Sequence, residues 1–280
     1  MPPHAFRPPP GFRPHGLHLD NASSRLYAVS HSDALHEEAI FVFDVPDAPP
    51  ADAPLALRLR FLLTSPRFEY HNRSLLWFLN DVAAVDGANE LYVTQLGPLD
   101  YSPATFQRDK ALWRCAWDEA ARQPDGRLPA ACAPALPERF LGLNGIAIDP
   151  AGNGTLYVND EFGGPSRASS QLLPFAREPA SGRLTPRGPP LGLRGSAIDN
   201  VELDHASGDL TMGQYSNQRK TSKDAELLKR AEGKGAFAPA TVVRRASLPA
   251  DVSYQVSSAL TYGRWTLLGS PWDLGPYVCG

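Results

Sequence analysis

Short apolar runs that alternate with polar residues dominate the chain, and the stretch Phe78–Gln95 (FLNDVAAVDGANELYVTQ) is one of the clearest. Apolar residues alternate after Asn80 and Asp81, a turn-forming Asp86-Gly87 pair follows, and a second apolar run ends the stretch. This pattern predicts a β-hairpin with one strand on each side of the turn. The neighbouring amide and carboxylate stand at the mouth of an apolar strand, where burial without partners is costly.

Four other segments repeat this pattern of a polar or His/Gly entry, alternation, a turn and an apolar strand. They are PHGLHLDNASSRLYAVSH, LNGIAIDPAGNGTLYVND, IDNVELDHASGDLTMGQYS and, more weakly, VSSALTYGRWTLLGS. The equivalent positions Gly16, Asp81, Gly145, Asn200 and Ser258 recur at intervals of 55 to 65 residues. That period fits a blade of four antiparallel strands.

The segments between these hairpins are expected to supply the outer strands. AIFVFDV, ALWRCAW and ATVVRRASL are rich in β-branched and aromatic residues, which favour strands. Helix is scarce, and its best candidate is the charged stretch KDAELLKRAEGK. The sequence therefore predicts an all-β fold of the β-propeller type.

Polar residues at the starts of the inner strands are expected to converge, because the innermost strands of a propeller line one channel and start at the same face. The residues concerned are Asn80, Asp81, Asn144, Asp199 and Asn200. Their oxygen atoms form a ligand set that suits calcium, and a cation would offset the cost of burying the two carboxylates. The alternative is that each residue is a turn-former that satisfies local backbone groups. Recurrence in register across three blades favours the metal site.

Two histidines of the first hairpin are candidates for acid–base chemistry. In the first repeat, His15 stands near the position that Asp81 and Gly145 occupy in the repeats to which they belong. His31 ends the same hairpin as His15. An inner hairpin can bring both rings to the channel mouth. A lone histidine is usually a surface or satisfied residue, but a pair beside a predicted metal is a candidate general-base dyad.

The composition is that of a globular chain of 280 residues, with 42% hydrophobic and 20% charged residues and a net charge of −3. No basic run points to nucleic acid. No apolar stretch approaches the roughly 18 to 20 residues that span a bilayer, so no transmembrane segment is expected. The 28 prolines and 23 glycines favour turns over long helices.

The first thirteen residues form a Pro-rich leader that we expect to be disordered, and they lack the apolar core of a signal peptide. Three N-glycosylation sequons begin at Asn21, Asn72 and Asn153. They are candidate glycan sites in a secreted protein.

Three cysteines make an odd number. Cys115 and Cys132 flank the loop CAWDEAARQPDGRLPAAC and could pair. Cys279 would then have no partner in this chain.

The motifs PHGL…YAVSH, LNDVAAVDGANELYVTQ, LNGIAID and AIDNVELDHASGDLTMG together resemble the paraoxonase/arylesterase family of calcium-dependent lactonases and esterases. The match runs from about Pro14 to the end of the chain, in the family's order. The resemblance implies a six-bladed β-propeller, a small ester or lactone substrate, and two calcium ions in the channel, one catalytic and one structural. It also implies a secretory-pathway location for the full-length form.

The resemblance also assigns roles to matching residues. The side chains that match ligands of the catalytic calcium are Asn80, Asn144, Asp199 and Asn200. Asp81 matches a ligand of the structural calcium, to which Leu17 would add a backbone carbonyl. His15 matches the general base and His31 its second histidine, so that calcium would stabilise the oxyanion while His15 activates water.

The chain also departs from the family's pattern. Family members have a first blade before the PHG segment, with a Glu-Asp pair that serves both ions, and this chain has only its leader there. Residues 14–280 are therefore expected to be an incomplete propeller that lacks the first blade, with the partner of Cys279 in the missing part. Gln214-Tyr215 stands where family members carry Cys-His, which would alter substrate preference.

Three functions are compatible with these features. The first is calcium-dependent hydrolysis of aryl esters and lactones. The second is a gluconolactonase-like hydrolysis of sugar lactones, and the third is a catalytically inactive propeller that serves as a binding or scaffold protein. Calcium dependence of folding and substrate profiling would separate them.

Overall fold

The structure is a computed structural model that describes the following residues: 12, 14–32, 37–46, 57–66, 68, 79–96, 110–149, 154–164, 170–193, 197–203, 209–215, 224–229, 241–247, 258–262, 265–269 and 277–279. Within them the fold is all-β, as the sequence predicts: five sheets are present, and the single helical element is the 3-10 turn η1 (Glu119–Ala121). The chain divides into two compact units. One comprises Met1–Leu99 and Leu112–Ala135, and the other Asp100–Ala111 and Leu136–Gly280.

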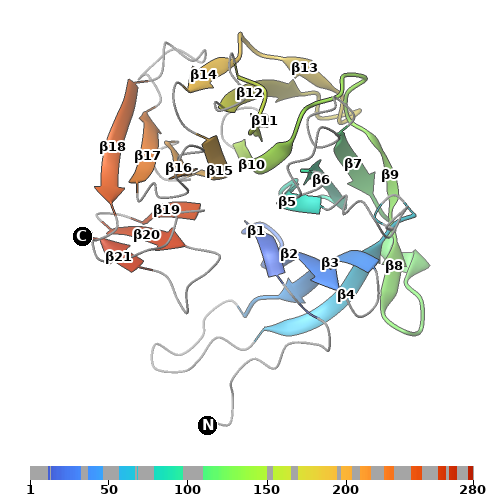
Figure 1. Cartoon of the computed structure of the whole chain (residues 1–280). Helices are drawn as coiled ribbons and strands as arrows, with labels where there is room; N and C mark the ends of the chain where they lie inside the picture. Colours follow the sequence, from blue (N-terminus) through green and yellow to red (C-terminus); the bar gives the residue numbers. More distant parts are fainter. Residues whose placement is uncertain are drawn as a thin grey trace. The chain divides into compact units, whose positions relative to one another are not determined.

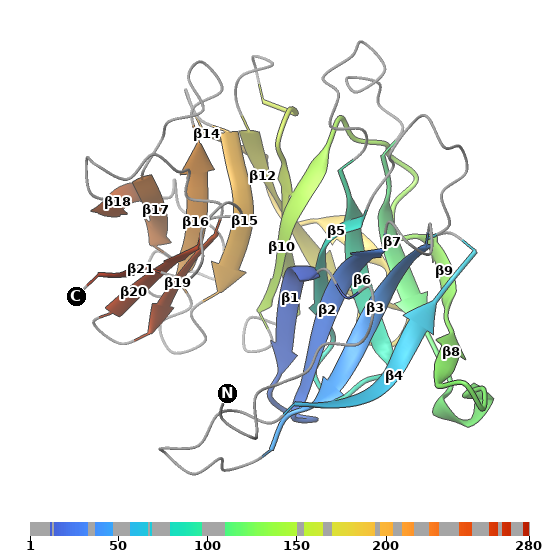
Figure 2. The same ribbon diagram turned by 60° about the horizontal axis from the view of Figure 1, so that its bottom comes forward.

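The first unit contains two sheets (Figure 1). One sheet has the order β1-β2-β3-β4-β8, with β1 (Pro14–Asp20), β2 (Arg25–Ser32), β3 (Glu37–Asp44), β4 (Arg58–Thr64) and β8 (Arg127–Pro129). Figure 2 shows β1 to β4 side by side, and the short strand β8 pairs parallel to β4. The other sheet has the order β5-β6-β7-β9, with β5 (Leu79–Ala84), β6 (Glu90–Gln95), β7 (Leu112–Ala116) and β9 (Ala131–Pro134).

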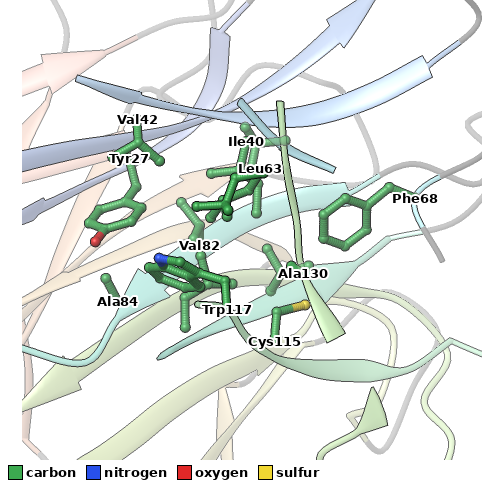
Figure 3. Packing of buried hydrophobic residues seen from close by; sticks show 14 of the residues in the cluster. Tyr27, Ile40, Val42, Leu63, Phe68, Val82, Ala84, Cys115, Trp117 and Ala130 are labelled. Atoms are coloured by element: carbon green, nitrogen blue, oxygen red, sulfur yellow. The ribbon is translucent and has the colours of Figure 1, made fainter. Parts of the chain in front are cut away.

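One apolar cluster joins the two sheets of the first unit. It combines Tyr27 and Ile40 of the first sheet with Val82 and Cys115 of the second, and Trp117 packs between them (Figure 3). The Tyr27 and Trp117 ring centroids lie 6.1 Å apart. These side chains are the inward positions of the alternation, so burial of one face per strand holds the two sheets together.

The expected pairing of Cys115 with Cys132 is confirmed. The two residues lie directly opposite each other on β7 and β9 and form a disulfide with a Cα–Cα distance of 4.1 Å. Cys279 ends a strand of the second unit, and its side chain lies outside the described part of the structure.

The second unit contains three sheets. The first comprises β10 (Leu143–Asp149), β11 (Thr155–Asp160), β12 (Ser170–Arg177), β13 (Leu184–Pro186) and β14 (Leu191–Leu193); β13 and β14 both pair with β12. The second has the order β15-β16-β17-β18, with β15 (Ala197–Leu203), β16 (Leu210–Tyr215), β17 (Asp224–Lys229) and β18 (Thr241–Ser247). The third consists of β19 (Ser258–Tyr262), β20 (Trp265–Gly269) and β21 (Tyr277–Cys279). Tyr157 of β11 and Met212 of β16 belong to one apolar cluster that joins the first two of these sheets.

All five predicted hairpins are present as antiparallel pairs: β1/β2, β5/β6, β10/β11, β15/β16 and β19/β20. The turn of the second hairpin passes through Gly87, whose φ of +66° is one that glycine adopts without strain. The three outer strands expected from composition are also confirmed, as β3, β7 and β18.

The helix expected for KDAELLKRAEGK is wrong over its described part. Asp224–Lys229 forms β17, which pairs antiparallel with β16 on one side and with β18 on the other. Two flanking strands satisfy the backbone N–H and C=O groups of this segment, and this pairing overrides the local helix propensity of its Ala, Glu, Leu and Lys residues.

Three further expectations concern the chain's periphery. Asn21 lies exposed in the turn between β1 and β2, so its sequon is accessible, whereas Asn72 and Asn153 lie outside the described residues. The expected leader also lies outside them, apart from Phe12, which packs edge-on against Phe41. Among the described residues, no helix has the length and hydropathy to cross a membrane.

Candidate functional site

A β-bulge marks the candidate residues in four of the five hairpins. The register shifts between Pro14 and Leu17 in β1, between Leu79 and Val82 in β5, between Leu143 and Ile146 in β10, and between Ile198 and Val201 in β15. Each shift spans two residues, and at least one of the two is a candidate site residue from the sequence analysis. Bulges turn side chains out of the regular alternation and recur beside active sites. The fifth hairpin, β19/β20, has a continuous register.

The bulges of the first unit assemble a chain of four polar side chains, which we call the histidine relay: Asn80, His15, His31 and Glu38. Asn80 Nδ2 lies 3.3 Å from His15 Nε2, and His15 Nδ1 lies 3.1 Å from His31 Nε2. His31 Nδ1 lies 3.0 Å from Glu38 Oε1. The two imidazole rings meet edge to face, with centroids 5.1 Å apart. The structure thus brings both candidate histidines together and adds a carboxylate behind them.

Glu38 is a functional candidate that sequence reasoning missed. It lies in β3 directly opposite His31 in β2, and its side chain is buried. Its second carboxylate oxygen accepts a hydrogen bond from the Leu79 backbone N–H at 2.5 Å. The available signal was the charged pair that precedes the apolar run AIFVFD, because a carboxylate at the start of a buried strand needs partners.

The surroundings of the relay keep its first histidine neutral. The enclosing protein atoms disfavour the imidazolium, and together with the charge of His31 they lower the pKa of His15 to about 4. The His15 side chain still has an exposed edge, which water can reach. Burial raises the pKa of Glu38, against the hydrogen bonds from His31 and Leu79 that lower it. At neutral pH, His15 is therefore in the form that can accept a proton.

Gly16 allows β1 to approach β5 at this point. A Cβ atom on Gly16 would lie 2.2 Å from Asp81 Oδ1 and 2.6 Å from the Asn80 backbone oxygen, so only glycine fits. Asp81 is buried, and its Oδ1 accepts the Val82 N–H at 2.9 Å. The side chain of the adjacent Leu17 is 47% exposed. The expected structural-calcium residues Asp81 and Leu17 therefore lie on strands that contact each other at Gly16.

The second unit contains a separate polar group, the Asn144 cluster, which consists of Asn144, Glu161, Asp199 and Asn200. Asn144 Nδ2 donates to Glu161 Oε2 at 3.1 Å, and the Asn144 side chain also hydrogen-bonds Asp199. Asn200 is held close by the approach of β10 to β15, because a Cβ atom on Gly145 would lie 2.3 Å from Val201 N and 2.7 Å from Asn200 Cα. The structure thus brings together three of the residues expected to share one calcium, Asn144, Asp199 and Asn200.

Glu161 is the second residue that sequence reasoning missed. It follows the last residue of β11, is 2% exposed, and its backbone carbonyl accepts a hydrogen bond from the Ser170 hydroxyl at 3.1 Å. Its neighbour Asp160 is also buried, but the Asp160 carboxylate accepts a hydrogen bond from the Gly142 backbone N–H at 3.1 Å. Two consecutive acidic residues after the apolar run TLYV were the available signal.

The carboxylates of the Asn144 cluster are disfavoured as anions. Burial raises the pKa of Asp199 from 3.8 to about 7, against a lowering effect of the hydrogen bond from Asn144. Burial also raises the pKa of Glu161 well above its ordinary value, and the nearby charge of Asp199 raises it further. Two carboxyl groups that repel each other in a buried site are the arrangement that a bound cation would relieve.

Both groups contain oxygen atoms that fit a hard cation. Asn80 Oδ1 and Asn200 Oδ1 are buried and have no hydrogen-bond partner, and amide and carboxylate oxygens are calcium ligands. The described residues contain no group of three or more His, Cys, Asp and Glu side chains that would by itself form a metal site. The expectation that Asn80 shares an ion with Asn144, Asp199 and Asn200 combines residues of both units and stays a prediction.

Comparisons with known proteins place the fold. No family model and no curated protein matches the chain. Among solved structures, a candidate 6-phosphogluconolactonase from Bacteroides uniformis aligns with a TM-score of 0.53 at 12% identity, over 95% of this chain and 66% of that one. An exo-β-1,3-galactanase from Phanerochaete chrysosporium aligns with a TM-score of 0.54 at 10% identity, over 92% of this chain and 56% of that one.

The chain therefore spans between about half and two thirds of the length of these structures. At identities this low, the likeness concerns the fold alone. It places the chain among all-β folds of the propeller type.

Proposed function

We propose that the chain is a hydrolase that opens lactone rings, with sugar lactones as its first substrate class and aryl esters as its second. The observation that carries this proposal is the histidine relay, which offers a neutral imidazole backed by a second imidazole and a carboxylate. The likeness to a candidate 6-phosphogluconolactonase supports the substrate class. Membership of the paraoxonase/arylesterase family, a six-bladed propeller and a secretory location of the full-length form belong to the same proposal.

The proposed chemistry begins with water at the exposed edge of His15. Nε2 of His15 takes a proton from water as the water oxygen attacks the ring carbonyl carbon. The positive charge that develops on His15 is stabilised through His31 by Glu38. The same proton then returns to the ring oxygen as the carbon–oxygen bond of the ring breaks, which yields a hydroxy acid. This sequence consumes one water per ring and needs no oxidant or reductant.

We propose calcium as the cofactor, with two ions as in the family that the motifs resemble. Asn144, Asp199 and Asn200 would hold the catalytic ion together with Glu161, and Asp81 and the Leu17 carbonyl would contribute to the structural one. The unpartnered Asn200 Oδ1 and the raised pKa of Asp199 support this assignment. When bound, calcium would polarise the ester carbonyl and stabilise the oxyanion.

The test is a pH-stat assay of the purified chain with glucono-δ-lactone, δ-valerolactone and phenyl acetate, in calcium and in EDTA. His15→Gln is expected to lower kcat by roughly 100-fold to 10,000-fold, the usual contribution of a general base. His18→Gln is the matched control, because His18 lies on the same strand but outside the relay. Full activity of His15→Gln would refute the role of the relay.

A second class of function remains an outcome of the same assay. A folded chain whose melting temperature rises with calcium, but which turns over none of the three substrates, would be a propeller-derived binding protein. In the hydrolase, faster turnover of the sugar lactone than of phenyl acetate is expected. The reverse order would favour the arylesterase function over the sugar lactonase.

A further inference from the structure

The hydrogen-bond directions in the histidine relay follow from its buried end. Among the described residues, Glu38 has hydrogen-bond contacts with the Leu79 backbone N–H at 2.5 Å and with His31 Nδ1 at 3.0 Å. A backbone N–H can only donate, and Glu38 in its ionised form can only accept. In its neutral form, His31 therefore carries its proton on Nδ1, which leaves a lone pair on its Nε2.

The same logic continues to the exposed end of the relay. His15 Nδ1 lies 3.1 Å from the lone pair of His31 Nε2, so His15 must donate through Nδ1. A neutral His15 then has its lone pair on Nε2. Asn80 Nδ2 can donate to it across 3.3 Å in the resting site, and water must displace this contact before His15 acts as the base. Asn80 Oδ1 has no hydrogen-bond partner, so no contact in the relay opposes this orientation of the amide.

We infer that Glu38 is a positioning residue that fixes the tautomers of His31 and His15, and thereby makes Nε2 of His15 the basic nitrogen. The tautomer assignment stands on the geometry, whereas its consequence for catalysis rests on the proposed function. Glu38 does not touch the reacting atoms. It acts through two imidazole rings, each of which passes on the direction of the hydrogen bond it receives.

Glu38→Gln offers a sharp test because the replacement has the same shape but can both donate and accept. The Leu79 N–H still requires an acceptor, so the glutamine must present its oxygen there and its NH₂ group to His31. His31 Nδ1 then becomes an acceptor, His31 donates through Nε2, and His15 accepts at Nδ1. The proton of His15 then lies on Nε2, the nitrogen that would have to accept a proton from water. The direction of each hydrogen bond from residue 38 to His15 is thereby reversed.

The primary readout is the ring-nitrogen chemical shifts of the chain's seven histidines, measured by long-range ¹H–¹⁵N correlation. His15→Gln and His31→Gln variants assign the two relay signals. Wild-type protein is expected to show the Nδ1–H tautomer at both positions, and Glu38→Gln the Nε2–H tautomer at both. Glu90→Gln is the control, since Glu90 is a buried carboxylate of the same unit that pairs with Arg114 outside the relay.

Either of two results would overturn the inference. One is an Nε2–H tautomer of His15, or a doubly protonated His31, in the wild-type protein at neutral pH. The other is a folded Glu38→Gln variant whose tautomers equal those of wild type. If the variant does not fold, the wild-type spectrum alone still decides the assignment.

Kinetics test the catalytic consequence separately. Glu38→Gln is expected to lower kcat by roughly 100-fold to 10,000-fold, the loss of rate expected when the general-base histidine is in the wrong tautomer. KM should change little. Inverted tautomers with unchanged kcat would leave the geometry correct and refute the use of His15 as the base. An inactive wild-type chain with the expected tautomers would refute the proposed function and not the role of Glu38.

Discussion

Replacing Asp199 by asparagine is expected to change how the stability of the calcium-free chain depends on pH. The pKa of Asp199 rises from 3.8 to about 7 on folding because burial disfavours its anion. Well below pH 3.8 the group is protonated in both the folded and unfolded states and does not affect stability. As the pH rises from about 4 to 7, the unfolded chain releases the proton while the folded chain retains it, so the free energy of unfolding falls.

The magnitude follows from the size of the shift. About 3 pKa units at 1.36 kcal/mol each give a loss of up to about 4 kcal/mol, which is complete above pH 7. Asp199→Asn keeps an oxygen that can accept from Asn144 but has no charge to bury. It also removes the charge that raises the pKa of Glu161. The variant should therefore gain stability over wild type as the pH rises.

The assay is urea unfolding in EDTA at half-unit steps between pH 4.5 and 8. The stability of Asp199→Asn relative to wild type should increase by about 3 kcal/mol across this range, because about 1 kcal/mol of the loss has already occurred at pH 4.5. Glu138→Gln, which neutralises an exposed carboxylate of the same unit, is the control and should show no such trend. A difference between Asp199→Asn and wild type that stays constant with pH would refute a buried, proton-linked Asp199.

Three other predictions concern single contacts. Gly16→Ala should cost about 1 to 3 kcal/mol of stability by melting temperature, because its Cβ meets Asp81 Cα and the Asn80 carbonyl oxygen, backbone atoms that cannot move aside; a loss below 0.5 kcal/mol would contradict the close approach. Cys115→Ser with Cys132→Ser should cost about 3 kcal/mol by urea unfolding, and reduction of wild type should equal it; an unchanged midpoint would contradict the disulfide. Glu161→Gln should weaken calcium binding by roughly tenfold or more in titration calorimetry at pH 8; unchanged affinity would remove Glu161 from the ligand set.

The hairpins and the polar residues at their entries were predictable from the sequence, because both are local features, whereas the register shifts at those entries are findings of the structure. Side-chain alternation reports which face of a strand is buried, and the Asp86-Gly87 pair marks a turn that glycine makes without strain. The pairing of Cys115 with Cys132 was also within reach, since the two residues flank a single loop. Propensity was a poorer guide at Asp224–Lys229, where strand pairing on both sides decided the structure.

The two acidic partners of the candidate sites were decided by the tertiary structure. Glu38 becomes the end of a relay because the register of β2 and β3 sets it opposite His31, and because packing of the two sheets brings the Leu79 N–H to it from 41 residues away. Glu161 joins the Asn144 cluster because β10, which carries Asn144, and β15, which carries Asp199, approach each other closely at Gly145.

The sequence by itself determined the order of the strands, the turns and the polar residues at the strand entries, because each is written in the spacing of neighbouring side chains. Only the tertiary structure decided which polar groups meet, because that depends on contacts between segments far apart in the chain. Burial then strengthens those contacts, since a carboxylate or an imidazole removed from water depends on the few partners it has left.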